Sequence, residues 1–257
     1  GGSKLKWVLR VGGGVIAFFL TVVLAGSGYW WVSSQWGWED MPEHRSATSS
    51  VSHVDPRFED ISPNATSILE VMTDLYGVPG ASAAVALDGE LVWAAATGHA
   101  GLESQDAMST MSVVRIGSTS KAMTATVLAR RHDAGTLSMD DTVGEHGTPL
   151  NPIWADLRLD RLMSHTAGFP GYEENTDFPD NVDTLLMRRS YASVEDGLRL
   201  VDGSDMIAVQ GERYHYSSFD VNLAASAAEK ASGVSFGELL EQEIREPLGL
   251  ETPLLGD

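Results

Sequence analysis

The sequence predicts an α+β domain in which a helical portion lies beside a sheet. Two apolar runs, residues 81–87 and 91–96, flank an Asp-Gly pair at 88–89, and this pattern is the strongest short-range signal for a β-hairpin. Helical spacing of apolar residues stands before the hairpin and again through the second half of the chain. The chain has 257 residues, 43% of them hydrophobic, so it can bury one sizeable core besides accessory segments.

The N-terminal segment, residues 1–32, is predicted to be a cytoplasmic tail with a transmembrane helix. An uncharged run over residues 11–38, long enough in its apolar part to cross a bilayer, follows three basic residues: Lys4, Lys6 and Arg10. Acidic residues come next, so the positive-inside rule places the remainder in the periplasm or outside the cell, with a bacterial inner membrane expected. A cleaved signal peptide is the alternative, because small residues stand near Ala25. Residues 33–58 are interpreted as a linker.

The folded domain is expected over residues 59–257, and its elements follow in order. Ser62 starts a predicted helix that ends near Gly77, just before the hairpin. Residues 118–134 contain neither Gly nor Pro, so they form a second predicted helix, and the glycine that follows them is a natural stop. Residues 157–231 are predicted to be mostly helical, interrupted by a loop at residues 166–180.

Composition excludes several classes of function. The chain has 36 acidic and 17 basic residues, a formal net charge of -19, whereas phosphate binding needs clustered Lys and Arg. Nucleic-acid partners are therefore not expected. There is no Cys, and the His residues show no ligand spacing, so neither a metal site nor another cofactor is expected. The expected partner is a small molecule or peptide substrate.

The chemistry is expected at residues 118–121, where Ser-x-x-Lys begins the second predicted helix. Residues three apart share a helical face, so the amine of Lys121 can reach the hydroxyl of Ser118. The positive potential of the helix N-terminus favours an alkoxide and a neutral amine, which makes Ser118 a candidate nucleophile. The motif alone is weak, because residues 3–6 also match it and a serine at a helix start is most often an ordinary cap.

The segments around the motif strengthen the prediction that Ser118 is catalytic. From about Asp60 to Leu250 the chain resembles serine hydrolases related to class C β-lactamases and low-molecular-weight penicillin-binding proteins. Three segments carry the resemblance in order and spacing: Arg-Ile-Gly-Ser-Thr-Ser-Lys at 115–121, Leu-Met-Ser-His-Thr-Ala-Gly at 162–168 and Gly-Glu-Arg-Tyr-His-Tyr-Ser-Ser at 211–218. The resemblance implies a β-lactamase/transpeptidase-like fold, with an antiparallel sheet flanked by helices and an all-helical portion.

The resemblance also implies a role for each site residue. Ser118 would be the acylated nucleophile and Lys121 its base or proton shuttle. Tyr216 would be the phenol that exchanges protons with the leaving group and water. Ser218 stands where the family often has Asn, and its hydroxyl can hydrogen-bond the substrate or Lys121. This replacement also fits related esterases, peptidases and mitochondrial-type β-lactamase-like proteins. His165 is interpreted as structural, because the resembling families have a His in this loop without using it as the base.

A rival motif lies at residues 233–237, where Gly-Val-Ser-Phe-Gly matches the nucleophile elbow of α/β-hydrolases. That elbow requires a strand before the serine, whereas a helical stretch precedes it here. Ser235 with Glu238 is therefore interpreted as a capping box at the start of another helix.

The C-terminal part of the resembling family has a late strand that bears Lys or His, then a small residue and Gly, and supplies one of the two oxyanion-hole amides. No such strand is recognised before Asp257, so the sequence is expected to be a fragment of a longer protein.

Three functions stay open at this point. The first is a serine hydrolase that acts through an acyl-enzyme on Ser118, with β-lactam, D-amino-acid peptide or small ester substrates. The second is a non-catalytic, penicillin-binding or sensor-like protein that is acylated without turnover. The third is an α/β-hydrolase that uses Ser235. The sequence leaves the substrate and the oligomeric state open.

Overall fold

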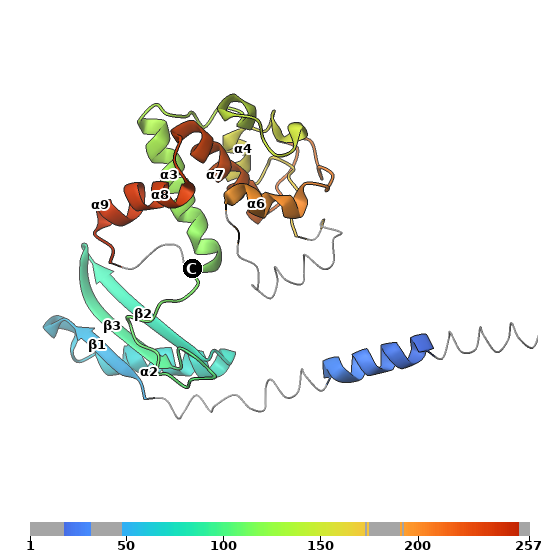
Figure 1. Ribbon diagram of the computed structural model, residues 1–257. Coiled ribbons are helices and arrows are strands. Elements are labelled where there is room, and N and C mark those ends of the chain that lie inside the picture. The colour runs from blue at the N-terminus through green and yellow to red at the C-terminus, as the bar shows by residue number, and fades with distance from the viewer. Residues whose placement is uncertain (1–17, 32–47, 173, 175–190, 192, 252–257) are drawn as a thin grey trace, which may run out of the picture. The chain divides into compact units, whose positions relative to one another are not determined.

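The computed structural model describes residues 18–31, 48–172, 174, 191 and 193–251 (Figure 1). The chain forms two compact units, Gly1–Val113 and Val114–Asp257, here called the N-terminal and the C-terminal unit. The boundary lies within the domain expected over residues 59–257. An antiparallel sheet lies in the N-terminal unit and a group of helices in the C-terminal unit, which confirms the α+β class.

The N-terminal unit contains a three-stranded antiparallel sheet with the strand order β1-β3-β2. The predicted hairpin is confirmed, because β2 (Gly80–Leu87) pairs with β3 (Glu90–Gly98). The turn residues Asp88 and Gly89 have φ values of 51° and 83°. Tight hairpin turns need this left-handed region, and Asp and Gly reach it more easily than other residues, so the Asp-Gly signal has a direct structural cause.

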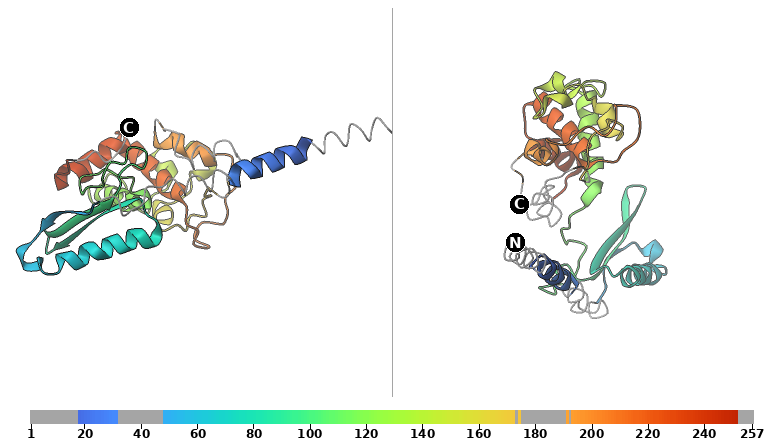
Figure 2. Two further views of the ribbon diagram at one scale, coloured as in Figure 1. Left: turned by 90° about the horizontal axis from the view of Figure 1, so that it is seen from below. Right: turned by 90° about the vertical axis from the view of Figure 1, so that its right-hand side faces the viewer.

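The first predicted helix is confirmed as α2 (Ser62–Tyr76). It ends at Gly77, which adopts the left-handed conformation with φ 60° and donates its N–H to the carbonyl of Asp74. α2 lies along the sheet and packs against β2 and β3 (Figure 2).

The strand β1 (Ser50–Val54) corrects part of the linker expected over residues 33–58. β1 pairs with β3, and its register shifts between Val51 and His53. A bulge inserts a residue and breaks the alternation by which a strand is recognised in sequence. The strand is also short and mostly exposed, so no apolar run marks it. Residues 33–47 of the expected linker lie outside the described residues.

Within the N-terminal segment, residues 18–31 form a helix with exposed side chains. In the part of the chain that the structure describes, no helix is both long and apolar enough to span a bilayer. The flanks of the predicted span, residues 11–17 and 32–38, lie outside that part. The described residues do not show the membrane anchor, so the anchor and the location outside the cytoplasm stay predictions.

The C-terminal unit is built around α7 (Ser218–Ser232), most of whose side chains are buried. It packs against α3 (Ser120–Asp133), α4 (Leu159–Met163) and α6 (Val194–Leu198). The region predicted to be mostly helical contains α4, α6 and α7. Its described residues 164–172 and 202–217 have no helix, so the prediction holds for these helices but overstates the helical share of the region. The remaining elements are short helices and turns: η4 (Val143–His146), η5 (Pro152–Trp154), η6 (Arg199–Val201), α8 (Phe236–Leu240), the π-helical η7 (Glu241–Arg245) and α9 (Glu246–Leu248).

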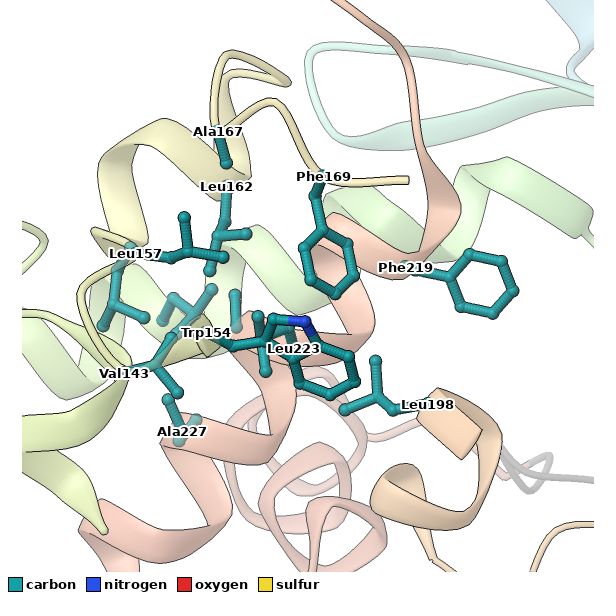
Figure 3. Close-up of a cluster of buried hydrophobic side chains, with 14 of the residues drawn as sticks. Val143, Trp154, Leu157, Leu162, Ala167, Phe169, Leu198, Phe219, Leu223 and Ala227 are labelled. Atoms are coloured by element: carbon teal, nitrogen blue, oxygen red, sulfur yellow. The ribbon is translucent and has the colours of Figure 1, made fainter. Parts of the chain in front are cut away.

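The core of this unit contains three large aromatic side chains, Trp154, Phe169 and Phe219 (Figure 3). The rings of Trp154 and Phe169 meet edge to face, with centroids 5.1 Å apart. Phe169 belongs to the loop after α4, whereas Phe219 belongs to the first turn of α7. Burial of such rings supplies several kcal/mol. The core therefore fixes this loop and the start of α7, which carry residues of the site described next.

Candidate active site

Ser118 lies in η3 (Gly117–Thr119), a single 3-10 turn that leads directly into α3. The helix predicted over residues 118–134 thus begins with a 3-10 turn. Gly117 has a φ of 52°, and Ser120 Oγ donates a 2.6 Å hydrogen bond to its carbonyl, which closes the turn. Ser118 is left exposed at the N-terminal end of a 14-residue helix, where the helix dipole favours an anionic oxygen.

The amine of Lys121 lies between two serine hydroxyls. Its Nζ donates to Ser118 Oγ at 3.0 Å and to Ser218 Oγ at 3.1 Å. The first contact follows from the spacing of three residues at the start of the helix, as predicted. The second joins α3 to the first residue of α7, so it depends on the tertiary structure.

Tyr216 completes the group of side chains around Ser118. Its hydroxyl donates a 2.7 Å hydrogen bond to Ser118 Oγ, and Lys121 Nζ lies 4.9 Å from the centroid of its ring. Hydrogen bonding with Lys121, and then with Ser118, lowers the pKa of the Tyr216 phenol. The side chain is 47% exposed, so the phenol is accessible to a substrate.

The local backbone explains why Tyr216 and Ser218 reach the same site. Ser217 between them is extended, with φ -133° and ψ 134°, and alternate residues of an extended segment point to opposite sides. Ser217 and Phe219 are buried, and Ser217 Oγ donates to the carbonyl of Pro170 at 2.7 Å. Ser217 Oγ also accepts the N–H of Phe219, which caps α7. Burial of Ser217 and Phe219 anchors the segment, while Tyr216 and Ser218 lie on the side of the site at Ser118.

Residues 65–257 match the family model described as Beta-lactamase. The chain belongs to the β-lactamase family. The structure brings the Ser-x-x-Lys segment and the Tyr-x-Ser segment of this chain together at Ser118.

Relatives in this family include the human mitochondrial serine beta-lactamase-like protein LACTB, 23% identical over 70% of this chain and 44% of the relative. The D-alanyl-D-alanine-carboxypeptidase/endopeptidase AmpH of Escherichia coli K12 is 27% identical over 54% of this chain and 36% of its own length. The octameric penicillin-binding protein homologue of Pyrococcus abyssi has a TM-score of 0.61 and 26% identity, over 74% of this chain and 43% of that chain. This chain spans less than half the length of each.

The likeness to solved structures confirms the β-lactamase/transpeptidase-like fold, with an antiparallel sheet and flanking helices. It also excludes the alternative fold. Ser235 is the N-cap of α8, and its hydroxyl and backbone N–H both donate to Glu238 Oε2, at 2.8 and 2.9 Å. The element before it is α7, not a strand. The nucleophile-elbow alternative is therefore wrong, and the capping box is confirmed.

The ring of His165 packs against the ring of Tyr216. Its ring centroid is 4.6 Å from that of Tyr216, and its Nδ1 is 2.8 Å from Oδ2 of Asp220. Burial, followed by the positive charges of Lys121 and His215, lowers the pKa of His165. Burial raises the pKa of Asp220 to about 8. Sequence reasoning does not single out Asp220, whose one sequence signal is an acid between the apolar residues Phe219 and Val221.

A metal centre has no counterpart in the described residues, since no group of three or more His, Asp or Glu side chains there is arranged to hold an ion. The polar groups that meet at Ser118 are an amine, a phenol and a second hydroxyl. This set can move protons to and from a serine oxygen, which is the requirement of acyl transfer.

Proposed function

We propose that the protein is a serine hydrolase that forms an acyl-enzyme on Ser118. The observation that carries the proposal is the convergence of Lys121 Nζ, at 3.0 Å, and Tyr216 OH, at 2.7 Å, on Ser118 Oγ. An ordinary helix-capping serine bonds to backbone groups of its own helix. Here two titratable side chains from different elements contact the hydroxyl, as a nucleophile with its proton acceptors requires.

In the proposed acylation step, Ser118 Oγ attacks the carbonyl carbon of an amide, ester or β-lactam, and its proton passes to Lys121 or to the phenolate of Tyr216. The bond from the acyl carbon to the leaving group then breaks, and the leaving nitrogen or oxygen takes a proton from Tyr216. The lowered pKa of Tyr216 supports this role, because a proton carrier works best when its pKa lies near the working pH.

In the proposed deacylation step, water attacks the acyl carbon and gives a proton to the Tyr216–Lys121 pair while the bond to Ser118 Oγ breaks. The proton returns to Ser118, so the site is restored without a net change. Ser218 supports both steps, since its Oγ accepts from Lys121 at 3.1 Å and keeps the amine directed at Ser118.

The proposed substrates are D-amino-acid peptides, β-lactams or small esters. Support comes from the family and from the name of AmpH, a carboxypeptidase and endopeptidase for D-alanyl-D-alanine. All three classes present a carbonyl carbon bonded to a nitrogen or oxygen leaving group, so the same Ser118 chemistry serves each of them.

Intact-mass spectrometry tests the nucleophile. The protein is exposed to a fluorophosphonate and, separately, to a penicillin, and the wild type is compared with Ser118→Ala and with Ser235→Ala as the matched control. The proposal expects one adduct in the wild type and in Ser235→Ala, and none in Ser118→Ala. An adduct that persists in Ser118→Ala, or the absence of any adduct in the wild type, contradicts it.

The time course of the penicillin adduct separates turnover from binding. A hydrolase releases the acyl group, so the adduct mass disappears once free penicillin is consumed. A stable adduct with no released product identifies the penicillin-binding, sensor-like alternative instead.

A further inference from the structure

Asp220 is a buried acid that the proposed acyl transfer does not use. It lies in the first turn of α7, and its side chain is only 1% exposed. Its Oδ2 contacts His165 Nδ1 at 2.8 Å, while its Oδ1 has no hydrogen-bond partner among the described residues. An ionised carboxylate in such a place costs several kcal/mol unless a cation pairs with it.

The position of the proton follows from a second contact. The backbone N–H of Ser217 points at the same His165 Nδ1, at 3.4 Å. A hydrogen on Nδ1 would repel this N–H, whereas the lone pair of an unprotonated Nδ1 attracts it, so the geometry favours Asp220 as the donor in the 2.8 Å contact. The hydrogen in the 2.8 Å contact then belongs to the carboxyl of Asp220, and the imidazole keeps its hydrogen on Nε2. The raised pKa of Asp220 and the lowered pKa of His165 agree with two neutral groups.

His165 is also tied to the segment that carries Tyr216. Its carbonyl accepts the N–H of His215 at 2.8 Å, and its ring packs on the Tyr216 ring at an interplanar angle of 51°. His165 has a φ of 56°, a conformation that few residues other than glycine adopt and that is often kept at functional sites.

The charged and titratable groups around this pair come from several elements. An ionised Asp220 would place a negative charge behind the phenol and oppose its loss of a proton. Asp220 from α7 and Lys121 from α3 face His165. The side chains of Tyr214, His215 and Tyr216, in the segment just before α7, also face it. Glu174 Oε1 lies 3.8 Å from His215 Nε2.

We propose that Asp220 and His165 form a neutral pair that shares one proton and positions Tyr216 for its proton exchange with Ser118. The inference rests on the proposed role of Tyr216. Asp220 and His165 are positioning residues in this arrangement. The carboxyl holds the imidazole by donating to Nδ1, the imidazole supports the phenol ring, and no negative charge is added beside Tyr216.

Nitrogen-15 NMR of the imidazole rings tests the pair without any need for activity. Long-range proton–nitrogen correlations are recorded at pH 7, and the His165 signals are identified by their loss in His165→Gln. The expected result is a neutral ring with hydrogen on Nε2 and an accepting Nδ1. A hydrogen on Nδ1, or a doubly protonated ring, overturns the proposal.

The pH profile of fluorophosphonate labelling tests the link to Ser118. Asn has the size of Asp and can donate to Nδ1 but does not ionise, so Asp220→Asn is expected to label within about threefold of the wild type at pH 7. Asp220 is neutral below its pKa of about 8, so the wild-type rate is expected to fall behind that of Asp220→Asn as pH rises through about 8.

Two further variants complete the comparison. Asp220→Leu removes the donor at similar size and is expected to label about ten times more slowly at pH 7, with circular dichroism reporting whether it folds. Asp196→Asn, an acid in α6, is the matched control and should follow the wild-type profile. The proposal fails if Asp220→Asn labels as poorly as Asp220→Leu at pH 7, or if its pH profile matches that of the wild type. If wild-type Ser118 is never labelled, the proposed function fails while the NMR result on the pair stands.

Discussion

Ser118 and Ser235 both stand at the start of a helix in the C-terminal unit, and each matches a catalytic motif in the sequence. Their surroundings differ. The hydroxyl of Ser235 is engaged by Glu238, three residues later in the same helix. The hydroxyl of Ser118 meets Tyr216, which is 98 residues away in the chain.

The difference shows what separates a capping serine from a candidate nucleophile. A cap uses its hydroxyl to satisfy backbone groups of its own first turn, so its partners are local. A nucleophile needs a group that takes its proton and a path that returns it. At Ser118 the amine of Lys121 comes from α3 and the phenol of Tyr216 from the segment just before α7. Ser218, the first residue of α7, holds the Lys121 amine from the other side.

The largest expected effect comes from removing the Ser118 hydroxyl. Ser118→Ala should lower the rate of substrate hydrolysis by at least about 10³-fold, because loss of a nucleophile abolishes the covalent route. Release of a chromophore from a small ester measures the rate. Hydrolysis that survives in Ser118→Ala and disappears in Ser235→Ala would identify Ser235, and not Ser118, as the nucleophile.

Tyr216→Phe should lower the same rate by about 10²- to 10⁴-fold, since the ring remains and only the proton-carrying hydroxyl is lost. The pKa of Tyr216 lies below its usual value of 10, so wild-type activity should rise with pH as the phenol ionises in that lowered range. This rise should be absent in Tyr216→Phe. Tyr214→Phe, two residues earlier in the chain and 65% exposed, is the control. Equal activity of Tyr216→Phe and the wild type would contradict the role of the phenol.

Ser218→Ala removes one hydrogen-bond acceptor of the Lys121 amine. Hydrogen bonds to charged groups contribute about 1.5–3 kcal/mol, so the expected loss in acylation rate is about 10- to 100-fold. Single-turnover labelling of Ser118 measures this step. Ser218→Thr keeps the hydroxyl and should retain most of the rate. If Ser218→Thr is as slow as Ser218→Ala, the hydroxyl is not what matters at this position.

The smallest effect on activity is expected at Ser235. Ser235→Ala should leave labelling of Ser118 unchanged and lower the free energy of unfolding by about 1 kcal/mol, the usual contribution of an N-cap. Urea denaturation followed by circular dichroism measures this change. Ser193→Ala removes the cap of α6 and should behave similarly. A loss of labelling in Ser235→Ala without loss of stability would mean that Ser235 has a catalytic part.

The features that the sequence predicted correctly have local causes. The β2–β3 hairpin follows from Asp88-Gly89, which reach left-handed conformations at low cost. The capping box follows from Ser235 and Glu238, whose spacing permits reciprocal hydrogen bonds. The approach of Lys121 to Ser118 follows from their separation by three residues.

The features that sequence reasoning missed depend on partners elsewhere in the chain. The sequence predicts linker at β1 because the bulge between Val51 and His53 removes the alternation of a strand, and the pairing with β3 supplies the order that its own residues lack. Asp220 has no strong sequence signal because its burial, and its contact with His165, exist only once α7 packs against the loop after α4.

The sequence by itself determined the class of the fold, because hydrophobic periodicity and turn residues act over a few residues. Its resemblance to a family named the candidate site residues. Only the tertiary structure decided which serine receives a proton acceptor and where the buried acid lies. Hydrogen bonds of 2.7–3.1 Å between side chains nearly 100 residues apart require α3 and α7 to pack in one arrangement, and the buried core around Trp154, Phe169 and Phe219 provides it.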